Sequence, residues 1–221
     1  MKIIKPSFEV QTEIDGEKIL KKLELAARTC YKSEDKITVD SAKKILAGLL
    51  KVNHHSVIEH ENITVKFITD RGILAELTRH RLCSFSVEST RYVNYKEGIT
   101  VILPPWVDID PGIYDINCPK FKDYADMIWF KHMVDCEENY QELIKQGYKP
   151  QQARSILPNS LKNEIVMTTN IREWRHIFNL RCTNVAHPQM RELLLPLLKY
   201  FHEKIPLLFD DIYDKYKDNI D

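Results

Sequence analysis

Fourteen residues in the first half of the chain are rich in groups that bind anions. The run Arg79-His80-Arg81-Leu82-Cys83-Ser84-Phe85-Ser86-Val87-Glu88-Ser89-Thr90-Arg91-Tyr92 holds three arginines, a histidine and three serines. Guanidinium groups bind phosphate and carboxylate oxygens through paired hydrogen bonds, and serine hydroxyls add further donors. The run therefore indicates a binding site for a phosphorylated or otherwise anionic ligand.

The stretch 71–78 directly before this run has the spacing of an amphipathic helix. Its apolar side is formed by Ile73, Leu74 and Leu77. If the helix continues at about 100° per residue, His80 and Arg81 fall on the apolar side, while Glu76 and Arg79 face away from it. Because a cation turned toward a core is costly unless an anion meets it there, we expect this helix to present cations to a ligand.

Cys83 and its neighbouring serines are candidate nucleophiles. No Gly-x-Ser-x-Gly motif surrounds any of the serines. Adjacent arginines could lower the pKa of the Cys83 thiol, but the helical geometry aims no base at it. The pattern favours serine hydroxyls that donate to phosphate oxygens alongside Arg91.

A second polar cluster falls on a predicted helix over 171–181. Arg172, His176 and Asn179 recur at i, i+4 and i+7, so three hydrogen-bonding side chains share one side and could bind a planar polar ligand. A solvated surface produces the same pattern and stays open as an alternative.

The ends of this helix add two further candidates. Asn170 is placed to cap the helix, with Glu173 completing a capping box, at a position where helix N–H groups attract anions. Arg181 falls near the apolar side of the helix. That side is formed by Ile171, Trp174, Ile177, Phe178 and Cys182.

The segment from His54 to His60 does not match a metal site. It lacks both zincin spacings, and His55 and His60 lie about 140° apart on a helix, so they could not share a metal. We expect a helix end with hydrogen-bonding histidines, and no metal. Arg154, alone on a short predicted helix between Pro150 and Pro158, would by itself be surface charge.

Composition narrows the class of protein. The chain has 221 residues, 43% of them apolar, and both Lys+Arg and Asp+Glu number 32, so no overall field favours nucleic acid or an acidic membrane. No apolar run approaches the roughly 18 residues of a membrane span, and no signal peptide is recognisable. Five scattered cysteines predict reduced thiols in a cytoplasmic protein.

Hydrophobic periodicity predicts an α+β fold. We expect an edge strand at 2–10, strands at 62–68, 100–103 and 164–169, extended chain at 86–95, a loop at 106–118, and helices at 16–29, 40–52, 120–146, 171–181 and, as a pair, 187–217. Six glycines and no Gly-rich phosphate loop argue against a Rossmann or P-loop site. The prediction is a single domain over 1–221, with mixed helices, including the C-terminal ones, packed on a small, mostly antiparallel sheet.

Four segments in order resemble one known family. Arg79-His80-Arg81, seven residues and then Ser89 are similar to the signature of the flavin-dependent thymidylate synthases, Arg-His-Arg-x7-Ser. The resemblance extends to His54–His60, to Ala153-Arg154-x-x-Leu157-Pro158, and to Asn170-x-Arg172 with Arg181 downstream. These segments cover most of residues 20–200.

The resemblance implies an enzyme, an FAD-dependent methyltransferase that converts dUMP to dTMP. It implies that 5,10-methylenetetrahydrofolate supplies the carbon, that NADPH reduces the flavin, and that tetrahydrofolate is released. It also implies a cytoplasmic homotetramer whose active sites are shared between chains, with neither nucleic acid nor a membrane as partner.

The resemblance also assigns residues by matched position. FAD is expected to contact Ser56, Arg79, His80, Arg81, Asn170, Arg172 and His176. The nucleotide is expected to contact Glu76, Arg79, Val87, Glu88, Ser89, Arg91, Arg154 and Arg181. Arg181 has the catalytic role of stabilising negative charge on the uracil ring, without an enzyme nucleophile, so Cys83 should be dispensable.

The chain departs from the family pattern at three points. Glu76 stands where some members have glutamine, and Cys30 stands where some have a serine near the flavin. Val87 occupies the place of an acidic residue, which here is Glu88. None of these departures removes a charge that the chemistry needs.

Two other functions stay open from the residues alone. One is a different flavoprotein or nucleotide-modifying enzyme on the same scaffold. The other is an RNA- or nucleotide-binding module that uses the Arg-His-Arg segment. The zero net charge and the absence of stacked-aromatic RNA motifs count against the second.

Overall fold

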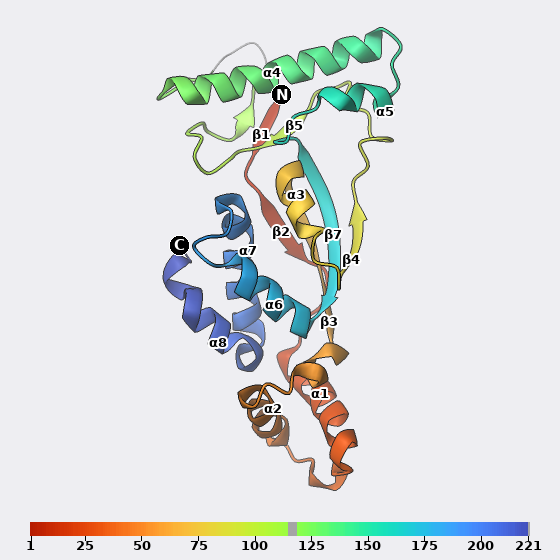
Figure 1. Ribbon diagram of the computed structural model, residues 1–221, viewed down its shortest axis with the longest axis vertical. Coiled ribbons are helices and arrows are strands. Elements are labelled where there is room, and N and C mark those ends of the chain that lie inside the picture. Colours follow the sequence, from red (N-terminus) through yellow and green to blue (C-terminus); the bar gives the residue numbers. More distant parts are fainter. Residues whose placement is uncertain (115–118, 221) are drawn as a thin grey trace. The chain divides into compact units, whose positions relative to one another are not determined.

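The computed structural model describes residues 1–114 and 119–220 (Figure 1). The strands are β1 (Lys2–Ile4), β2 (Ser7–Val10), β3 (Asn62–Asp70), β4 (Ser84–Val87), β5 (Thr100–Ile102), β6 (Gly112–Ile113) and β7 (Lys162–Asn170). The α-helices are α1 (Gly16–Tyr31), α2 (Ser41–Lys51), α3 (Arg71–Leu77), α4 (Tyr124–Lys145), α5 (Pro150–Ala153), α6 (Ile171–Arg181), α7 (Pro188–Lys204) and α8 (Pro206–Tyr216). Four short 3-10 segments are η1 (Glu34–Lys36), η2 (His55–His60), η3 (Arg154–Ile156) and η4 (Lys217–Asn219).

The predicted α+β class is confirmed, with two small, mostly antiparallel sheets in place of one. The first sheet has the order β5-β1-β6, in which β1 pairs parallel with β5 and antiparallel with β6. The second has the order β2-β3-β7-β4. None of the helices in the described part of the chain combines the length and apolar character needed to cross a bilayer.

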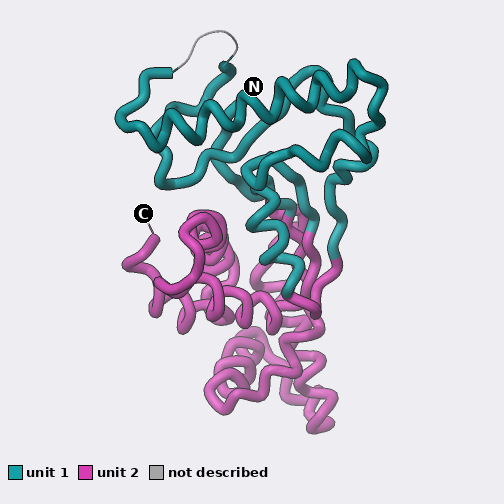
Figure 2. The backbone as a smooth tube through the Cα atoms, turned by 45° about the horizontal axis from the view of Figure 1, so that its top comes forward, with its two compact units in different colours: residues 1–8, 66–79, 85–166 teal, residues 9–65, 80–84, 167–221 magenta. Residues whose placement is uncertain are grey.

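The chain divides into two compact units, each assembled from several stretches (Figure 2). The first unit comprises residues 1–8, 66–79 and 85–166, and the second comprises 9–65, 80–84 and 167–221. The division falls inside β3 and β7, so both long strands contribute residues to both units. A single domain over 1–221 stays a prediction.

The core of the first unit lies between helix α4 and the three-stranded sheet. Phe130 and Met133 of α4 pack with Ile3 of β1 and Val101 of β5, and all four are buried. The large apolar residues Tyr124 and Ile128 of α4 do not join this core, because both side chains are exposed. The inward residues follow the spacing Asp126, Phe130, Met133, Tyr140, and position 128 lies about 200° around the helix from 126 and 130.

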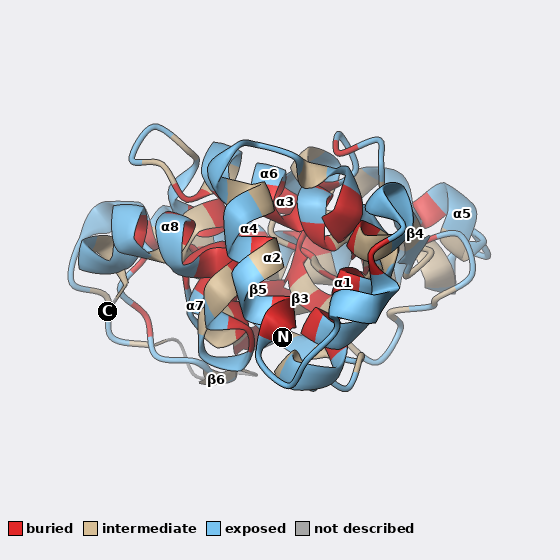
Figure 3. Cartoon of the chain, turned by 90° about the horizontal axis from the view of Figure 1, so that it is seen from below, coloured by how far each residue is buried: buried red, intermediate tan, exposed pale blue. Residues whose placement is uncertain are grey.

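Aromatic rings fill the core of the second unit. Trp174 and Phe178 of α6 pack against Phe201 of α7, with ring centroids 5.4 and 5.5 Å apart, and Phe209 of α8 joins them. The indole N–H of Trp174 donates to the carbonyl of Ile63 at 3.1 Å, which satisfies its buried polar atom. The predicted apolar side of this helix is therefore confirmed. Figure 3 colours each residue by burial and shows that the helices carry buried residues on one side and exposed residues on the other.

Two predicted segments differ from the structure. Residues 2–10 form two strands, because Pro6 has no N–H to donate to a ladder. The first of them, β1, has a neighbour on each side, so the expected edge strand is wrong for this half. The expected loop at 106–118 contains the short strand β6, and residues 115–118, with Cys118, lie outside the described residues.

Gly16 tests the packing of the start of α1 against the end of α7. A Cβ atom at Gly16 would overlap the carbonyl oxygen of Lys204, so Gly16→Ala should lower the free energy of unfolding by about 2 kcal/mol. Gly48 is the matched control, because a Cβ there meets nothing within 4 Å and alanine is a better helix former. Gly48→Ala should raise the stability by about 0.5–1 kcal/mol. Urea unfolding of both variants measures this, and a Gly16→Ala protein as stable as the parent would contradict it.

Candidate active site

Helix α3 ends before the Arg-His-Arg segment. The N–H of Thr78 donates to Leu74 and that of Arg79 donates to Glu76, which closes the helix in a tight turn. The prediction that the helix continues to residue 81 is therefore wrong. His80 is buried, with 5% of its surface exposed, whereas Arg81 is exposed to solvent and not turned toward the core. Arg81 thus avoids the cost of taking a guanidinium out of water.

The turn after β4 organises the predicted nucleotide residues of the first unit. The carbonyl of Ser89 accepts hydrogen bonds from the N–H groups of Tyr92 and Val93, at 3.1 and 3.0 Å. The hydroxyl of Ser89 accepts from the N–H of Arg91 at 3.3 Å. Ser89 therefore sets the path of the backbone, while the Arg91 side chain remains exposed.

Arg154 joins this turn from a distant part of the sequence. Its Nη1 donates to the hydroxyl of Thr90 at 3.4 Å, and Thr90 is 4% exposed. The predicted short helix between Pro150 and Pro158 is confirmed as α5 followed by η3, where Arg154 lies. The structure thus brings Arg154 to Thr90, the chain neighbour of Ser89 and Arg91, although the two residues are more than sixty positions apart in sequence.

Three exposed guanidinium groups of the first unit lack a carboxylate partner among the described residues. Arg79, Arg91 and Arg154 are exposed, and none forms an ion pair with any residue in 1–114 or 119–220. Arg28 and Arg175, by contrast, are paired with Glu24 and Asp211. Unpaired guanidinium groups of this kind suit the oxygens of a phosphate.

The second unit contains an open pocket of about 410 Å³, a size within the range of small-molecule sites. It lies among the ends of α1 and α2, η2 and the start of α6. Its lining residues are Ala27, Cys30, Tyr31, Leu49, Asn53, His54, His55, Ser56, Val57 and Arg172. Two predicted FAD residues, Ser56 and Arg172, therefore share one pocket, and Cys30 lies there as well.

The donors of this pocket fit a phosphorylated cofactor. Arg172 supplies a guanidinium group and Ser56 a hydroxyl group, both of which can donate to phosphate oxygens. Arg172 also forms an ion pair with Glu59 at 2.5 Å, and both side chains are about half exposed. Burial, with help from Arg175 and Arg172, lowers the pKa of His55, so this ring is neutral near pH 7 and can donate and accept.

His80, His176, Glu173 and Arg181 form a separate cluster in the same unit. The Nε of Arg181 donates to Nε2 of His80 at 3.2 Å, and the rings of His80 and His176 meet edge to face at 6.4 Å. Nδ1 of His80 lies 3.8 Å from Oε1 of Glu173. Burial chiefly, then the charges of Arg181 and His176, lower the pKa of His80 to about 4. His80 is therefore a neutral acceptor that orients the guanidinium group of Arg181.

The polar residues of α6 and its N-cap do not all face the pocket. Asn170 accepts from the N–H of Glu173 at 2.9 Å, so its capping role is confirmed. Arg172 and His176 are exposed, whereas the amide of Asn179 donates to the carbonyl of Arg175 within the helix. Asn179 is thus occupied by its own helix, and Arg172 alone of this predicted row lines the pocket.

The other predicted site residues lie outside the pocket, and Cys83 does not have the properties of a nucleophile. Burial raises the pKa of Cys83 to about 11, although a hydrogen bond with Thr169 opposes the effect, so the thiol stays protonated and is a poor nucleophile. Glu76 lies in α3 and is half-buried, Val87 ends β4, and Arg81 lines no part of the pocket. Within the described residues, no three His, Cys, Asp or Glu side chains are placed to hold a metal.

Sequence analysis missed the residues that hold Glu88. Tyr95 and Lys162 bond to its carboxylate, and Asn163 bonds to its carbonyl. The available signal was the oppositely charged pair Lys162 and Glu164 on alternate positions of a strand, which puts both on one face.

The structure thus combines an α+β scaffold with unpaired guanidinium groups in one unit and a pocket lined by the guanidinium group of Arg172 in the other, a set of donors that suits phosphorylated ligands. A family model described as "Thymidylate synthase complementing protein" matches residues 15–207. The chain belongs to this family, and the resemblance drawn from its motifs is confirmed.

Named relatives agree with this family. The chain is 34% identical over 199 residues to the flavin-dependent thymidylate synthase of Corynebacterium aurimucosum, which covers 86% of this chain and 79% of the relative. It is 31% identical over 217 residues to that of Mycobacteroides abscessus, with 95% and 85% covered. The fold is similar to the crystal structure of a UMP/dUMP methylase PolB from Streptomyces cacaoi bound with 5-Br UMP, with a TM-score of 0.74, 18% identity, and 98% and 97% of the two chains covered.

The lowered pKa of His80 predicts how stability depends on pH. The unfolded chain binds a proton at His80 near pH 6.5 and the folded chain only near pH 4, so stability falls as the pH drops from about 7 to 4. The full effect is on the order of 3 kcal/mol. His80→Asn, which keeps an acceptor for Arg181, should remove this part of the slope. Urea unfolding at a fixed FAD concentration measures it, and equal slopes in both proteins would contradict the assignment.

Proposed function

We propose that this chain is an FAD-dependent thymidylate synthase, which converts dUMP to dTMP by reductive methylation. The one-carbon unit comes from 5,10-methylenetetrahydrofolate, NADPH is the reductant, and tetrahydrofolate is released. The observation that carries the proposal is the set of unpaired guanidinium groups at Arg79, Arg91 and Arg154, in a chain of this family.

The phosphate of dUMP binds to this guanidinium set. Arg154 reaches Thr90, which lies between Ser89 and Arg91 in the chain, so the side chains of Ser89 and Arg91 can contribute donors to the same site. A phosphate with two negative charges favours paired guanidinium donors over the single point charge of lysine. Arg79 adds a third cation, and Glu76 and the backbone of Val87 and Glu88 lie alongside the rest of the nucleotide.

FAD binds to the residues of the second unit, with Arg79. Ser56 and Arg172 hold part of it in the 410 Å³ pocket. His80, Arg81, Asn170 and His176 complete the set. When bound, FAD supplies the hydride chemistry of the reaction, with electrons from NADPH. Cys30, which lines the same pocket, replaces a hydroxyl with a thiol and removes no charge.

Arg181 stabilises the negative charge that develops on the uracil ring. The hydrogen bond to neutral His80 fixes the orientation of the guanidinium group in the second unit. A fixed cation in a half-buried position stabilises developing charge more strongly than a mobile one in water. No enzyme nucleophile is needed, in agreement with the raised pKa of Cys83.

The enzyme acts as a homotetramer in the cytoplasm, with active sites shared between chains. Large apolar side chains that remain exposed on the single chain support such contacts. They include Val185, Ile113, Tyr92 and Leu82, which are 95%, 79%, 77% and 75% exposed.

Release of tritium from [5-³H]dUMP tests the proposal. The purified protein with FAD, NADPH and 5,10-methylenetetrahydrofolate should release tritium and form dTMP, and omission of any one should stop turnover. Flavin binding without tritium release would favour a different flavoprotein. A colourless protein with steep salt dependence toward polyanions would favour a nucleic-acid-binding module.

Arg181→Ala should abolish turnover, with a loss of at least about 100-fold in kcat, because the charge on the uracil ring loses its fixed partner. The flavin absorbance of the purified variant should be unchanged. Lys199→Ala, which removes an exposed cation from α7, is the control and should retain full activity. An Arg181→Ala enzyme with near-normal kcat would remove the assigned role.

Cys83→Ala should remain active to within about twofold, because a thiol with a pKa near 11 carries almost no thiolate at pH 7–8. Alkylation of the parent should label exposed Cys30 well before Cys83. Loss of activity in a variant with a native circular dichroism spectrum would revive a thiol mechanism.

A further inference from the structure

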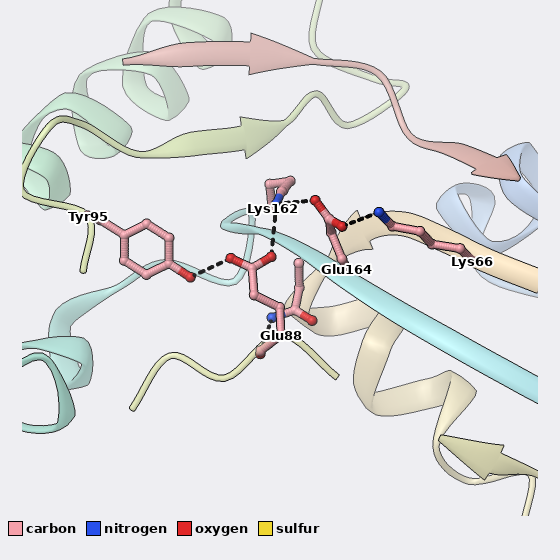
Figure 4. A network of polar contacts seen from close by, with 6 residues as sticks. Lys66, Glu88, Tyr95, Lys162 and Glu164 are labelled. Atoms are coloured by element: carbon pink, nitrogen blue, oxygen red, sulfur yellow. Dashed lines mark hydrogen bonds and ion pairs between the residues drawn. The ribbon is translucent and has the colours of Figure 1, made fainter. Parts of the chain in front are cut away.

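Glu88 is held more firmly than any contact with a ligand requires. Its N–H donates to the carbonyl of Glu164 at 2.9 Å, and its carbonyl accepts from the amide of Asn163 at 3.0 Å. Its two carboxylate oxygens accept from the hydroxyl of Tyr95 at 3.0 Å and from Nζ of Lys162 at 2.9 Å (Figure 4). Every polar group of this residue is therefore bound by its own unit.

The partners of Glu88 are themselves fixed. Lys162 also bonds to Glu164 at 2.8 Å, and Glu164 forms an ion pair with Lys66 at 2.5 Å (Figure 4). Two carboxylates raise the pKa of Lys162 against the effect of burial, and burial beside Glu88 raises the pKa of Tyr95. Both groups are therefore protonated donors at neutral pH. Asn163 is fully buried, and its Oδ1 has no partner in the described part of the chain.

Glu88 lies close to Arg91 along the chain, so its carboxylate could pair with that arginine if the network did not hold it. Glu88 directly precedes the turn in which Ser89, Thr90 and Arg91 lie, and Arg91 is three residues away. Residues at this spacing in a turn are close enough for a carboxylate and a guanidinium group to pair. Because Tyr95 and Lys162 occupy both carboxylate oxygens, the Glu88 charge is already compensated and Arg91 remains unpaired.

We propose that Lys162, Tyr95 and Asn163 are positioning residues for the nucleotide, which act through Glu88 and rest on the function proposed above. They have two effects. They fix the start of the turn that carries Ser89 and Arg91, so less conformational freedom is lost when a phosphate binds. They also keep the carboxylate of Glu88 from competing with that phosphate for guanidinium groups.

Lys162→Met is the direct test, in the FAD-loaded enzyme. Loss of the ammonium group frees a carboxylate oxygen, so the KM and the calorimetric Kd for dUMP should rise about tenfold, with kcat within about twofold of the parent. Lys162→Met with Glu88→Gln removes the competing charge and should recover most of the affinity. Rescue of this kind distinguishes charge competition from structural damage.

Lys66→Met is the matched control. It removes the other ion pair of Glu164, in the same network, but touches no atom of Glu88. Its Kd for dUMP should equal that of the parent. Tyr95→Phe removes one hydroxyl with little change in volume, and should raise the Kd about threefold even if Lys162→Met does not fold.

The outcomes separate this inference from the function on which it rests. A parent enzyme that binds no dUMP overturns both. A parent that binds dUMP, with Lys162→Met and Tyr95→Phe binding equally well, overturns the inference alone. Equal losses in Lys66→Met and Lys162→Met, without rescue by Glu88→Gln, also overturn it.

Discussion

Which arginines have a carboxylate partner, and which do not, determines where this protein can bind an anionic ligand. The chain carries 32 basic and 32 acidic residues, so every arginine could in principle find a carboxylate. The fold pairs some of them, as in the bidentate contact of buried Arg175 with Asp211, which ties α6 to α8. It leaves Arg79, Arg91 and Arg154 without a carboxylate in the described residues. Since these guanidinium groups have no counter-charge from the protein, a phosphorylated ligand can pair with them.

His80, in the second unit, is also controlled by a nearby charge, because the guanidinium group of Arg181 disfavours its protonation. A protonated His80 would repel Arg181, and burial together with that guanidinium group keeps the ring neutral. A neutral ring offers a lone pair at Nε2, to which the Nε of Arg181 donates. The buried imidazole is therefore an orienting acceptor, and the cation that it orients is the one assigned to the uracil ring.

Sequence reasoning predicted those parts of the fold that depend on local pattern. The apolar side of α6, the cap at Asn170 and the end of α4 at Gly147, whose φ is +89°, follow from spacing and residue type. The end of α3 at Leu77 could not be predicted, because the apolar spacing continues to His80 while the hydrogen bonds do not. The contact of Glu88 with Lys162 could not be predicted either, because it joins segments that lie 74 residues apart in sequence. Arg154, which contacts Thr90, was assigned to the site only through the family motif. From the sequence pattern alone, a single arginine on a short helix resembles ordinary surface charge.

The claim that the unpaired guanidinium groups exist to bind a nucleotide phosphate is tested most directly by a crystal structure with FAD and dUMP bound. The account predicts that the phosphate oxygens of dUMP lie within hydrogen-bond distance of the guanidinium groups of Arg91 and Arg154, and that Glu88 keeps its contacts with Lys162 and Tyr95. A structure in which those guanidinium groups pair with the protein's own carboxylates, with the phosphate bound elsewhere, would contradict it.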